Sequence, residues 1–163
     1  MNRTEDEAKP YQTFEDLEVY QVAREFRKAM YRVAKRLPQE EKFGLTSQIR
    51  RAAVSLTNNI AEGHGRFHFL EQIKFMLQSR GSLEELLDDL NVCADEGYLS
   101  IQEIESVRQD GWRVHKLING YIRFLRRRAS GDSPRVQEVA TDDDMKDVFP
   151  DRFNRSSFQR FNE

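Results

Sequence analysis

A chain of 163 residues suits one domain with extensions and is long enough to bury an apolar core. One third of the residues are charged, and no apolar run approaches the roughly 20 residues that a membrane-spanning helix needs. The first residues contain no apolar core of a signal peptide, so we expect a cytoplasmic protein without membrane association. Cys93 is the only cysteine, which excludes an internal disulfide and a cysteine-rich zinc site. We expect its side chain to be buried.

The net charge of -2 conceals a separation of charge along the chain. Residues 24–66 carry ten basic and four acidic side chains, whereas residues 71–110 carry three basic and ten acidic ones. Residues 113–128 then carry six basic side chains and no acidic one. Such a chain presents a basic surface to nucleic acid, or pairs its basic and acidic faces between copies of itself. Composition alone does not choose between the two.

The first predicted helix begins near Thr13, where Asp16 three residues later completes a capping pattern, and it ends before Pro38. Apolar residues recur through this segment at helical spacing. A second helix is predicted over about residues 46–62, and small side chains on its apolar face permit a neighbouring helix to approach closely. The second helix is expected to end at the two glycines that follow it, Gly63 and Gly65.

A third helix is predicted over about residues 69–96, with an apolar stripe that Arg80 interrupts. The fourth begins after Ser100, where Glu103 completes a capping box, and it ends near Arg128. Short connections between long helices imply antiparallel neighbours. The predicted fold class is therefore all-α, an antiparallel up-down-up-down four-helix bundle with a C-terminal extension.

Three regions are expected: a flexible N-terminal arm over residues 1–12, the bundle over residues 13–128, and a linker with a tail over residues 129–163. Within the tail, Thr141 is placed to cap a short helical turn in an acidic cluster. The last sixteen residues interleave four phenylalanines with three arginines, namely Phe149, Phe153, Phe158, Phe161, Arg152, Arg155 and Arg160. Such a segment is either disordered or a docking peptide for another surface.

Three ordered motifs carry a family resemblance: GLTSQIRRAAVSLTNNIAEGHGR at residues 44–66, GSLEEL at residues 81–86 and EGYLS at residues 96–100. With them the chain resembles, over about residues 14–128, the four-helix-bundle family of the bacterial ribosomal RNA intervening-sequence proteins. That family also includes the accessory variability determinant of diversity-generating retroelements. The resemblance implies a ring, with five subunits, and no catalytic signature. For the retroelement branch of the family, the resemblance implies a reverse transcriptase and its template RNA as partners. For the intervening-sequence branch, it implies an association with ribosomal RNA.

The motif residues are expected to have structural roles, and they are Arg50, Arg51, Asn59, Glu62, Gly63, Gly81 and Glu85. A partly buried charge must be paired, so a cross-helix pair between one of the two arginines and Glu85 would hold the register of the bundle. The alternative makes these arginines ligands for phosphate. Asparagine is a poor residue for a helix interior, so Asn58 and Asn59 are expected to hydrogen-bond a neighbouring helix or loop.

Two basic clusters are candidate nucleic-acid-binding residues. At the end of the fourth helix, arginines alternate with Tyr121 and Phe124, a pattern suited to phosphates and unpaired bases, and these arginines are Arg123, Arg126, Arg127 and Arg128. Cations there also complement the helix dipole, but four exceed what that effect requires. The second cluster lies on the first helix and includes Arg27, Lys28, Arg32 and Lys35.

Two histidine patterns bear on metal binding and on catalysis. His64 and His68 have no carboxylate or cysteine to complete a ligand set, so no metal site is expected. Arg108 and His115 have the loose spacing of the HEPN ribonucleases, in which arginine binds the scissile phosphate and histidine acts as acid or base. A histidine packed between helices is the favoured interpretation of His115.

The sequence as a whole predicts a non-catalytic accessory protein without cofactor or metal, which binds nucleic acid through basic surfaces. A homo-oligomer is expected, because the apolar faces of the first and fourth helices exceed what one bundle can bury. One alternative is a protein-interaction scaffold with a Phe-rich docking tail. The other is a ribonuclease of the HEPN type.

Overall fold

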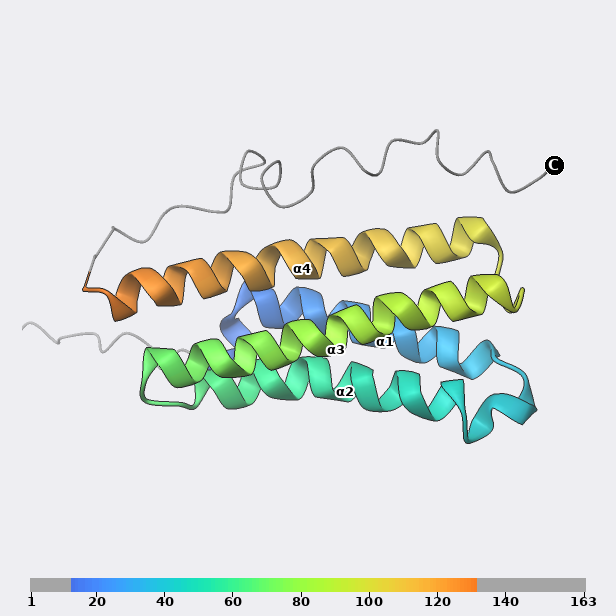
Figure 1. Cartoon of the computed structure of the whole chain (residues 1–163), viewed down its shortest axis with the longest axis horizontal. Helices are drawn as coiled ribbons and strands as arrows, with labels where there is room; N and C mark the ends of the chain where they lie inside the picture. The colour runs from blue at the N-terminus through green and yellow to red at the C-terminus, as the bar shows by residue number, and fades with distance from the viewer. Residues whose placement is uncertain (1–12, 132–163) are drawn as a thin grey trace, which may run out of the picture. The chain divides into compact units, whose positions relative to one another are not determined.

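The computed structural model describes residues 13–131 and consists of four long helices, α1 (Glu18–Arg36), α2 (Leu45–His64), α3 (Phe69–Asp95) and α4 (Ile101–Ala129) (Figure 1). Two short 3₁₀ turns, η1 (Phe14–Asp16) and η2 (Gln39–Lys42), precede α1 and α2. This part of the chain contains no strand, so the all-helical fold class is confirmed. The predictions for the arm at residues 1–12 and for the tail beyond residue 131 lie outside the described residues.

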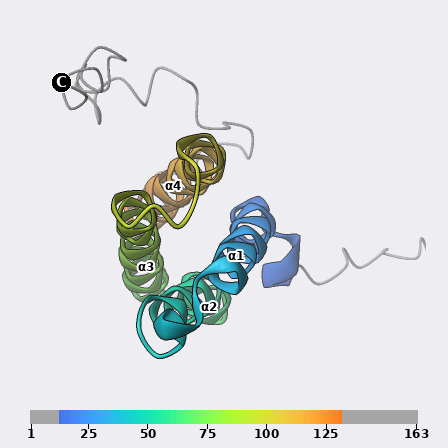
Figure 2. The ribbon, with the colours of Figure 1, turned by 90° about the vertical axis from the view of Figure 1, so that its right-hand side faces the viewer.

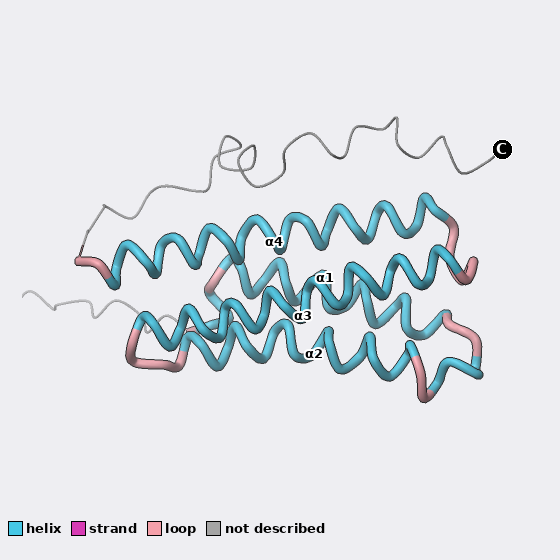
Figure 3. Tube along the Cα trace, in the orientation of Figure 1, coloured by secondary structure: helices cyan, strands magenta, loops and turns pink. Residues whose placement is uncertain are grey.

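The four helices enclose one core. Each helix packs against the next along the chain, and α4 also packs against α1, so that the end-on view shows them around a common centre (Figure 2). The colours of Figure 1 show successive helices running in opposite directions, and Figure 3 shows the short connections between them. The core includes fully buried side chains from all four helices, among them Met30, Leu56, Leu83 and Ile118. Cys93 is also fully buried, as predicted.

The EGYLS motif at residues 96–100 forms the connection between α3 and α4. Gly97 has φ of 66°, and the amide of Tyr98 donates to the carbonyl of Cys93 at 2.9 Å, which is the hydrogen bond of a Schellman helix end. The Ser100 hydroxyl then accepts from the Glu103 amide, while the Glu103 carboxylate accepts from the Ser100 amide. The predicted capping box at the start of the fourth helix is thus confirmed.

The capping pattern at Thr13 does not start the first long helix. The Thr13 amide donates to Asp16 at 2.7 Å, but this box encloses only the three residues of η1. Leu17 then adopts an extended conformation, with ψ of 125°, and α1 begins at Glu18. The predicted start was therefore wrong by one short turn, because a local capping pattern does not specify how long the following helix is.

Small residues bring α2 and α3 close together. The Ser79 hydroxyl donates to the Leu56 carbonyl at 2.7 Å, and the Ser82 hydroxyl donates to that of Ser55 at 2.8 Å. A Cβ at Gly63 would lie 2.8 Å from Phe75 Cβ, so glycine is needed there for the approach of the two helices. The predicted end of the helix at two glycines is confirmed for Gly65, which occupies the C-cap, whereas Gly63 lies within α2, which continues to His64.

The large exposed apolar side chains of the bundle differ from those expected. The apolar stripe of α1 is buried within the bundle, and Ile101 is the one large apolar side chain that α4 exposes. Leu70 and Leu77 of α3 are 70% and 37% exposed, and Val92 is also exposed. The bundle covers most of the apolar faces of the first and fourth helices, so the expected excess of apolar surface there is small, although side chains such as Val22, Trp112 and Leu117 stay partly exposed. Among residues 13–131, none of the helices combines the length and the hydropathy of a transmembrane segment.

Candidate nucleic-acid interface

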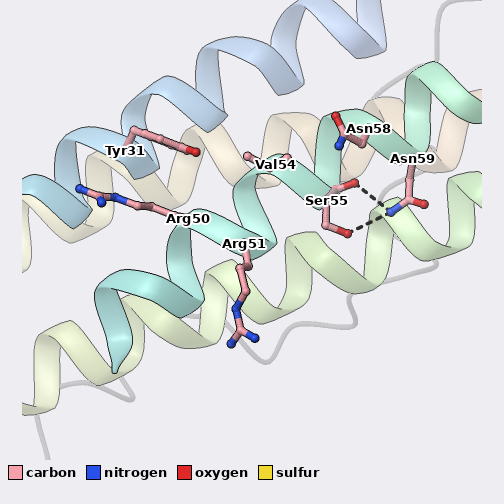
Figure 4. A pocket seen from close by; sticks show the side chains of 7 residues that line it. All are labelled: Tyr31, Arg50, Arg51, Val54, Ser55, Asn58 and Asn59. Carbon is pink, nitrogen blue, oxygen red and sulfur yellow. Dashed lines mark hydrogen bonds between the residues drawn. The ribbon is translucent and has the colours of Figure 1, made fainter. Parts of the chain in front are cut away.

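A groove runs along the outer surface where α1 and α2 pack together, and we call it the α1–α2 groove. Its α1 side is lined by Arg27, Lys28, Tyr31, Arg32 and Lys35, with Val54 opposite. A second depression shares Tyr31 and Val54 and continues over α2, where its further lining residues are Arg50, Arg51, Ser55, Asn58 and Asn59 (Figure 4). All four α1 residues that were predicted to bind nucleic acid therefore lie in one groove.

The cations of α1 follow one another on the groove side. Lys28, Arg32 and Lys35 are three or four residues apart, which places successive side chains about 5 to 6 Å from one another along the helix. All three are exposed to solvent. Their charged groups can therefore reach an anion in the groove without first losing a buried partner.

Arg27 is held differently, because it is half-buried. Its Nη1 donates to the Thr57 hydroxyl at 2.7 Å, and this hydroxyl donates in turn to the Val54 carbonyl at 3.3 Å. A guanidinium has five N–H donors, so this contact fixes the side chain and leaves further donors for a ligand. Arg27 thus joins α1 to α2 and supplies a positioned positive charge at the groove.

Arg50 and Arg51 are both exposed, and in Figure 4 they leave α2 in different directions. Glu85 is exposed as well, and residues 13–131 contain no ion pair between it and either arginine. The predicted register-holding pair was therefore wrong. Ser82 provides the polar link from that motif to α2, through its 2.8 Å hydrogen bond to Ser55.

The groove has little negative charge nearby. Residues 45–61 of α2 include no acidic residue. On α1, Glu25 accepts a 2.7 Å hydrogen bond from Lys28, and this bond lowers the pKa of the Glu25 carboxyl. Both side chains are largely exposed, so the pair is weak and a phosphate can compete for the lysine. The electrostatics of the groove therefore favour a polyanion.

The remaining motif residues of α2 and α3 have mainly local roles. Asn59 donates to the Ser55 carbonyl at 2.8 Å, which satisfies it within its own helix and not across to a neighbour. Asn58 is exposed and lines the groove. Glu62 forms an i,i+4 ion pair with Arg66. Gly81 is exposed, and a Cβ added there would meet no atom within 4 Å.

The arginines at the end of α4 form a separate site. The guanidinium carbon of Arg128 lies 5.7 Å from the ring centroids of both Phe69 and Phe124, and Phe124 stacks on Tyr121 with the centroids 5.9 Å apart. Arg126 and Arg127 are exposed, whereas Arg123 is half-buried. None of these arginines lines the α1–α2 groove. The structure thus separates the two predicted basic clusters.

Tyr31 and Val54 are groove residues that the sequence analysis missed. Tyr31 is three residues from Lys28 and four from both Arg27 and Lys35, so helical spacing alone places it among those cations. Val54 gives a weaker signal, since a single valine between polar residues resembles an ordinary exposed position. It is 37% exposed and lines both depressions.

Arg108 and His115 do not converge on a common site. Arg108 donates to Asn91 at 2.9 Å and lies 3.7 Å from Glu105. His115 is buried and pairs instead with Glu84 at 3.2 Å and with Asn119 at 3.2 Å.

A directional hydrogen-bond chain fixes the imidazole of His115. Asn119 Oδ1 accepts from Arg80 at 3.0 Å, so its amide nitrogen donates to His115 Nδ1. The proton then lies on Nε2 and points to Glu84. Burial lowers the pKa of His115, which favours this neutral form. These contacts make His115 a packed residue between α3 and α4.

The described residues include no group of three or more histidine, cysteine, aspartate or glutamate side chains that could hold a metal ion. His64 ends α2 and His68 is the N-cap of α3, so the two do not share a continuous helix. Asp89 is a buried carboxylate near the α2–α3 contact, and it accepts a 3.1 Å hydrogen bond from Gln48.

The described residues form an all-helical bundle, and the comparison with known families assigns the chain to a family. A family model described as 23S rRNA-intervening sequence protein matches residues 15–120, so the chain belongs to this family. The matched region contains both sides of the α1–α2 groove but ends before the arginines of the α4 terminus. No curated protein matches the chain.

Proposed function

We propose that this protein is a non-catalytic accessory protein that binds nucleic acid through the α1–α2 groove. The observation that carries the proposal is a basic surface formed by Arg27, Lys28, Arg32 and Lys35 of α1 together with Arg50 of α2, whose residues 45–61 include no acidic residue. Phosphate neutralisation by such side chains dominates nucleic-acid affinity and depends little on sequence. The name of the family, which refers to an intervening sequence of 23S rRNA, supports RNA as the ligand.

The arginines at the end of α4 are a second candidate contact. Arg126, Arg127 and Arg128 project from the last turn, and the aromatic rings beside Arg128 resemble the stacking surfaces of single-strand-binding proteins. A ribosomal RNA and the template RNA of a reverse transcriptase both fit contacts of this kind. We place the function in the cytoplasm, where either ligand would be met.

A homo-oligomer is part of the proposal, and the ring of five subunits follows from the family resemblance. The outward surface of α3 exposes Leu70 and Leu77, which are two helical turns apart and therefore lie on one face. Replacing both with glutamate should yield a smaller species in light scattering. A wild-type protein that is monomeric at micromolar concentration would contradict the assembly.

The binding proposal is tested by fluorescence anisotropy with a labelled single-stranded RNA and two triple variants that each remove three charges. We expect Arg32→Gln/Lys35→Gln/Arg50→Gln to lose at least about tenfold in affinity, since each lost phosphate contact weakens binding. Arg126→Gln/Arg127→Gln/Arg128→Gln reports on the second site. The variant Arg113→Gln, which changes an exposed arginine outside both clusters, serves as a control. Equal affinity of the groove variant and wild type, both folded, would favour the scaffold alternative.

A further inference from the structure

We propose that the α1–α2 groove prefers single-stranded to double-stranded nucleic acid, because one unpaired base stacks on the ring of Tyr31. The inference rests on the proposed function and specifies the ligand of the same site. Tyr31 and Val54 line both depressions of the groove, so the ring lies where the two meet. Figure 4 shows the Tyr31 side chain extending from α1 toward Val54 of α2.

The ring is suited to stacking by its partial burial. Tyr31 is half-buried and packs against the core, so its position is fixed by the bundle. It also lines the groove and remains partly exposed to a ligand there. Its hydroxyl gives the ring a polar edge at the groove (Figure 4). A rigid aromatic ring with such an edge is a base-stacking surface of the kind that single-strand-binding proteins use.

Cations surround the ring on both helices. Lys28 and Lys35 flank it on α1, and Arg50 stands on the α2 side. A strand whose base lies on Tyr31 would therefore have phosphates on either side within reach of positive charge. Val54, which is 37% exposed, offers apolar contact for the other part of the base.

A duplex offers no base to the Tyr31 ring. Its bases stay paired and stacked on one another, which leaves none for Tyr31. A surface that bound by charge alone would instead prefer the duplex. Duplex DNA carries one charge per about 1.7 Å of axis and therefore attracts cations more strongly than a single strand does.

The test compares a single-stranded RNA of twelve nucleotides with the duplex it forms with its complement, by anisotropy at one salt concentration. Wild type should bind the single strand more tightly. Tyr31→Leu should weaken single-strand binding about 5- to 100-fold, the range for loss of one stacked base, and should leave duplex binding and the salt slope unchanged. Tyr31→Phe, which keeps the ring, should retain the single-strand affinity.

Tighter binding of the duplex by wild type would overturn the inference, and this measurement needs no variant to fold. Equal single-strand affinity of folded Tyr31→Leu and wild type would overturn it too. In both cases salt-dependent binding that Arg32→Gln/Lys35→Gln/Arg50→Gln weakens would leave the proposed function in place. Absence of any salt-dependent binding would instead remove the proposed function, and the inference with it.

Discussion

Arg27 of α1 and Thr57 of α2 are joined by a 2.7 Å hydrogen bond from Nη1 to the hydroxyl, at the edge of the α1–α2 groove. Thr57 is only 1% exposed, so an arginine that borders solvent is held by a buried hydroxyl on the neighbouring helix. The contact connects the packing of the bundle to the position of a cation in the proposed binding surface.

The Arg27–Thr57 bond is predicted to stabilise the fold measurably. Hydrogen bonds to charged groups contribute about 1.5 to 3 kcal/mol, and partial exposure of Arg27 favours the lower end. A double-mutant cycle with Arg27→Met and Thr57→Val should therefore give a coupling free energy of about 1.5 kcal/mol in urea unfolding. Additive single and double variants would show that the bond contributes nothing to stability.

Replacing Gly111 or Gly81 with alanine should change the free energy of unfolding in opposite directions. A Cβ at Gly111 would lie 2.7 Å from Leu87 Cδ2 and 3.2 Å from the Phe26 ring, so Gly111→Ala should lower the free energy of unfolding by about 1 to 3 kcal/mol. Gly81 is helical with open space around it, so Gly81→Ala should raise that free energy by about 0.5 to 1 kcal/mol.

Thermal or urea unfolding of the two alanine variants measures both effects, and each is the control for the other. Destabilisation by Gly81→Ala, accompanied by a smaller species in light scattering, would show that another subunit occupies the space beside Gly81. Stabilisation by both variants would contradict the close approach of α4 to α1 and α3.

Asp89 is predicted to destabilise the protein at neutral pH. Burial raises the pKa of Asp89 to about 6, with further contributions from Glu85 and Asp88, and its Oδ2 has no hydrogen-bond partner among residues 13–131. The folded-state pKa exceeds the ordinary value of 3.8, so protonation of this carboxyl favours the folded state. The resulting stabilisation is fully present below pH 3.8. That contribution is lost as the pH rises through about 6.

Asp89→Asn should therefore increase the free energy of unfolding at pH 7.5 by roughly 1 to 3 kcal/mol, and much less at pH 4. Urea unfolding between pH 4 and 8 measures the difference from wild type, which removes the effect of the other titrating groups. The exposed variant Asp110→Asn is the matched control. A difference that does not change with pH would show that Asp89 has an ordinary pKa.

The protein is predicted not to cleave RNA. Both imidazole nitrogens of His115 are engaged, with Asn119 and with Glu84, and Arg108 is occupied by Asn91 and Glu105. A labelled RNA should remain intact with wild type over hours, with and without divalent cations. Cleavage by wild type that is absent in a folded His115→Gln variant would replace our interpretation with the ribonuclease alternative.

Features set by a few neighbouring residues were predictable from the sequence. The capping box of Ser100 and Glu103 forms as expected, because it needs only a four-residue pattern. Arg50 and Arg51 were harder to place, since they lie between the buried Ile49 and Ala52, and spacing alone did not fix which way each side chain points.

The groove itself depends on how α1 and α2 lie side by side. The contact between Arg27 and Thr57 joins residues thirty positions apart, and no local pattern specifies the register of two helices. The sequence analysis could therefore identify the cations of α1. It could not show that Tyr31, Val54 and Arg50 would complete a binding surface with them.

The salt dependence of nucleic-acid binding tests the central claim most directly. The logarithm of the association constant for a single-stranded RNA should fall linearly with the logarithm of salt concentration. In Arg32→Gln/Lys35→Gln/Arg50→Gln this slope should be shallower by about 2 per subunit engaged, because each lost phosphate contact removes about 0.7. An unchanged slope, with the variant folded and of the same oligomeric size, would contradict the α1–α2 groove as the binding surface.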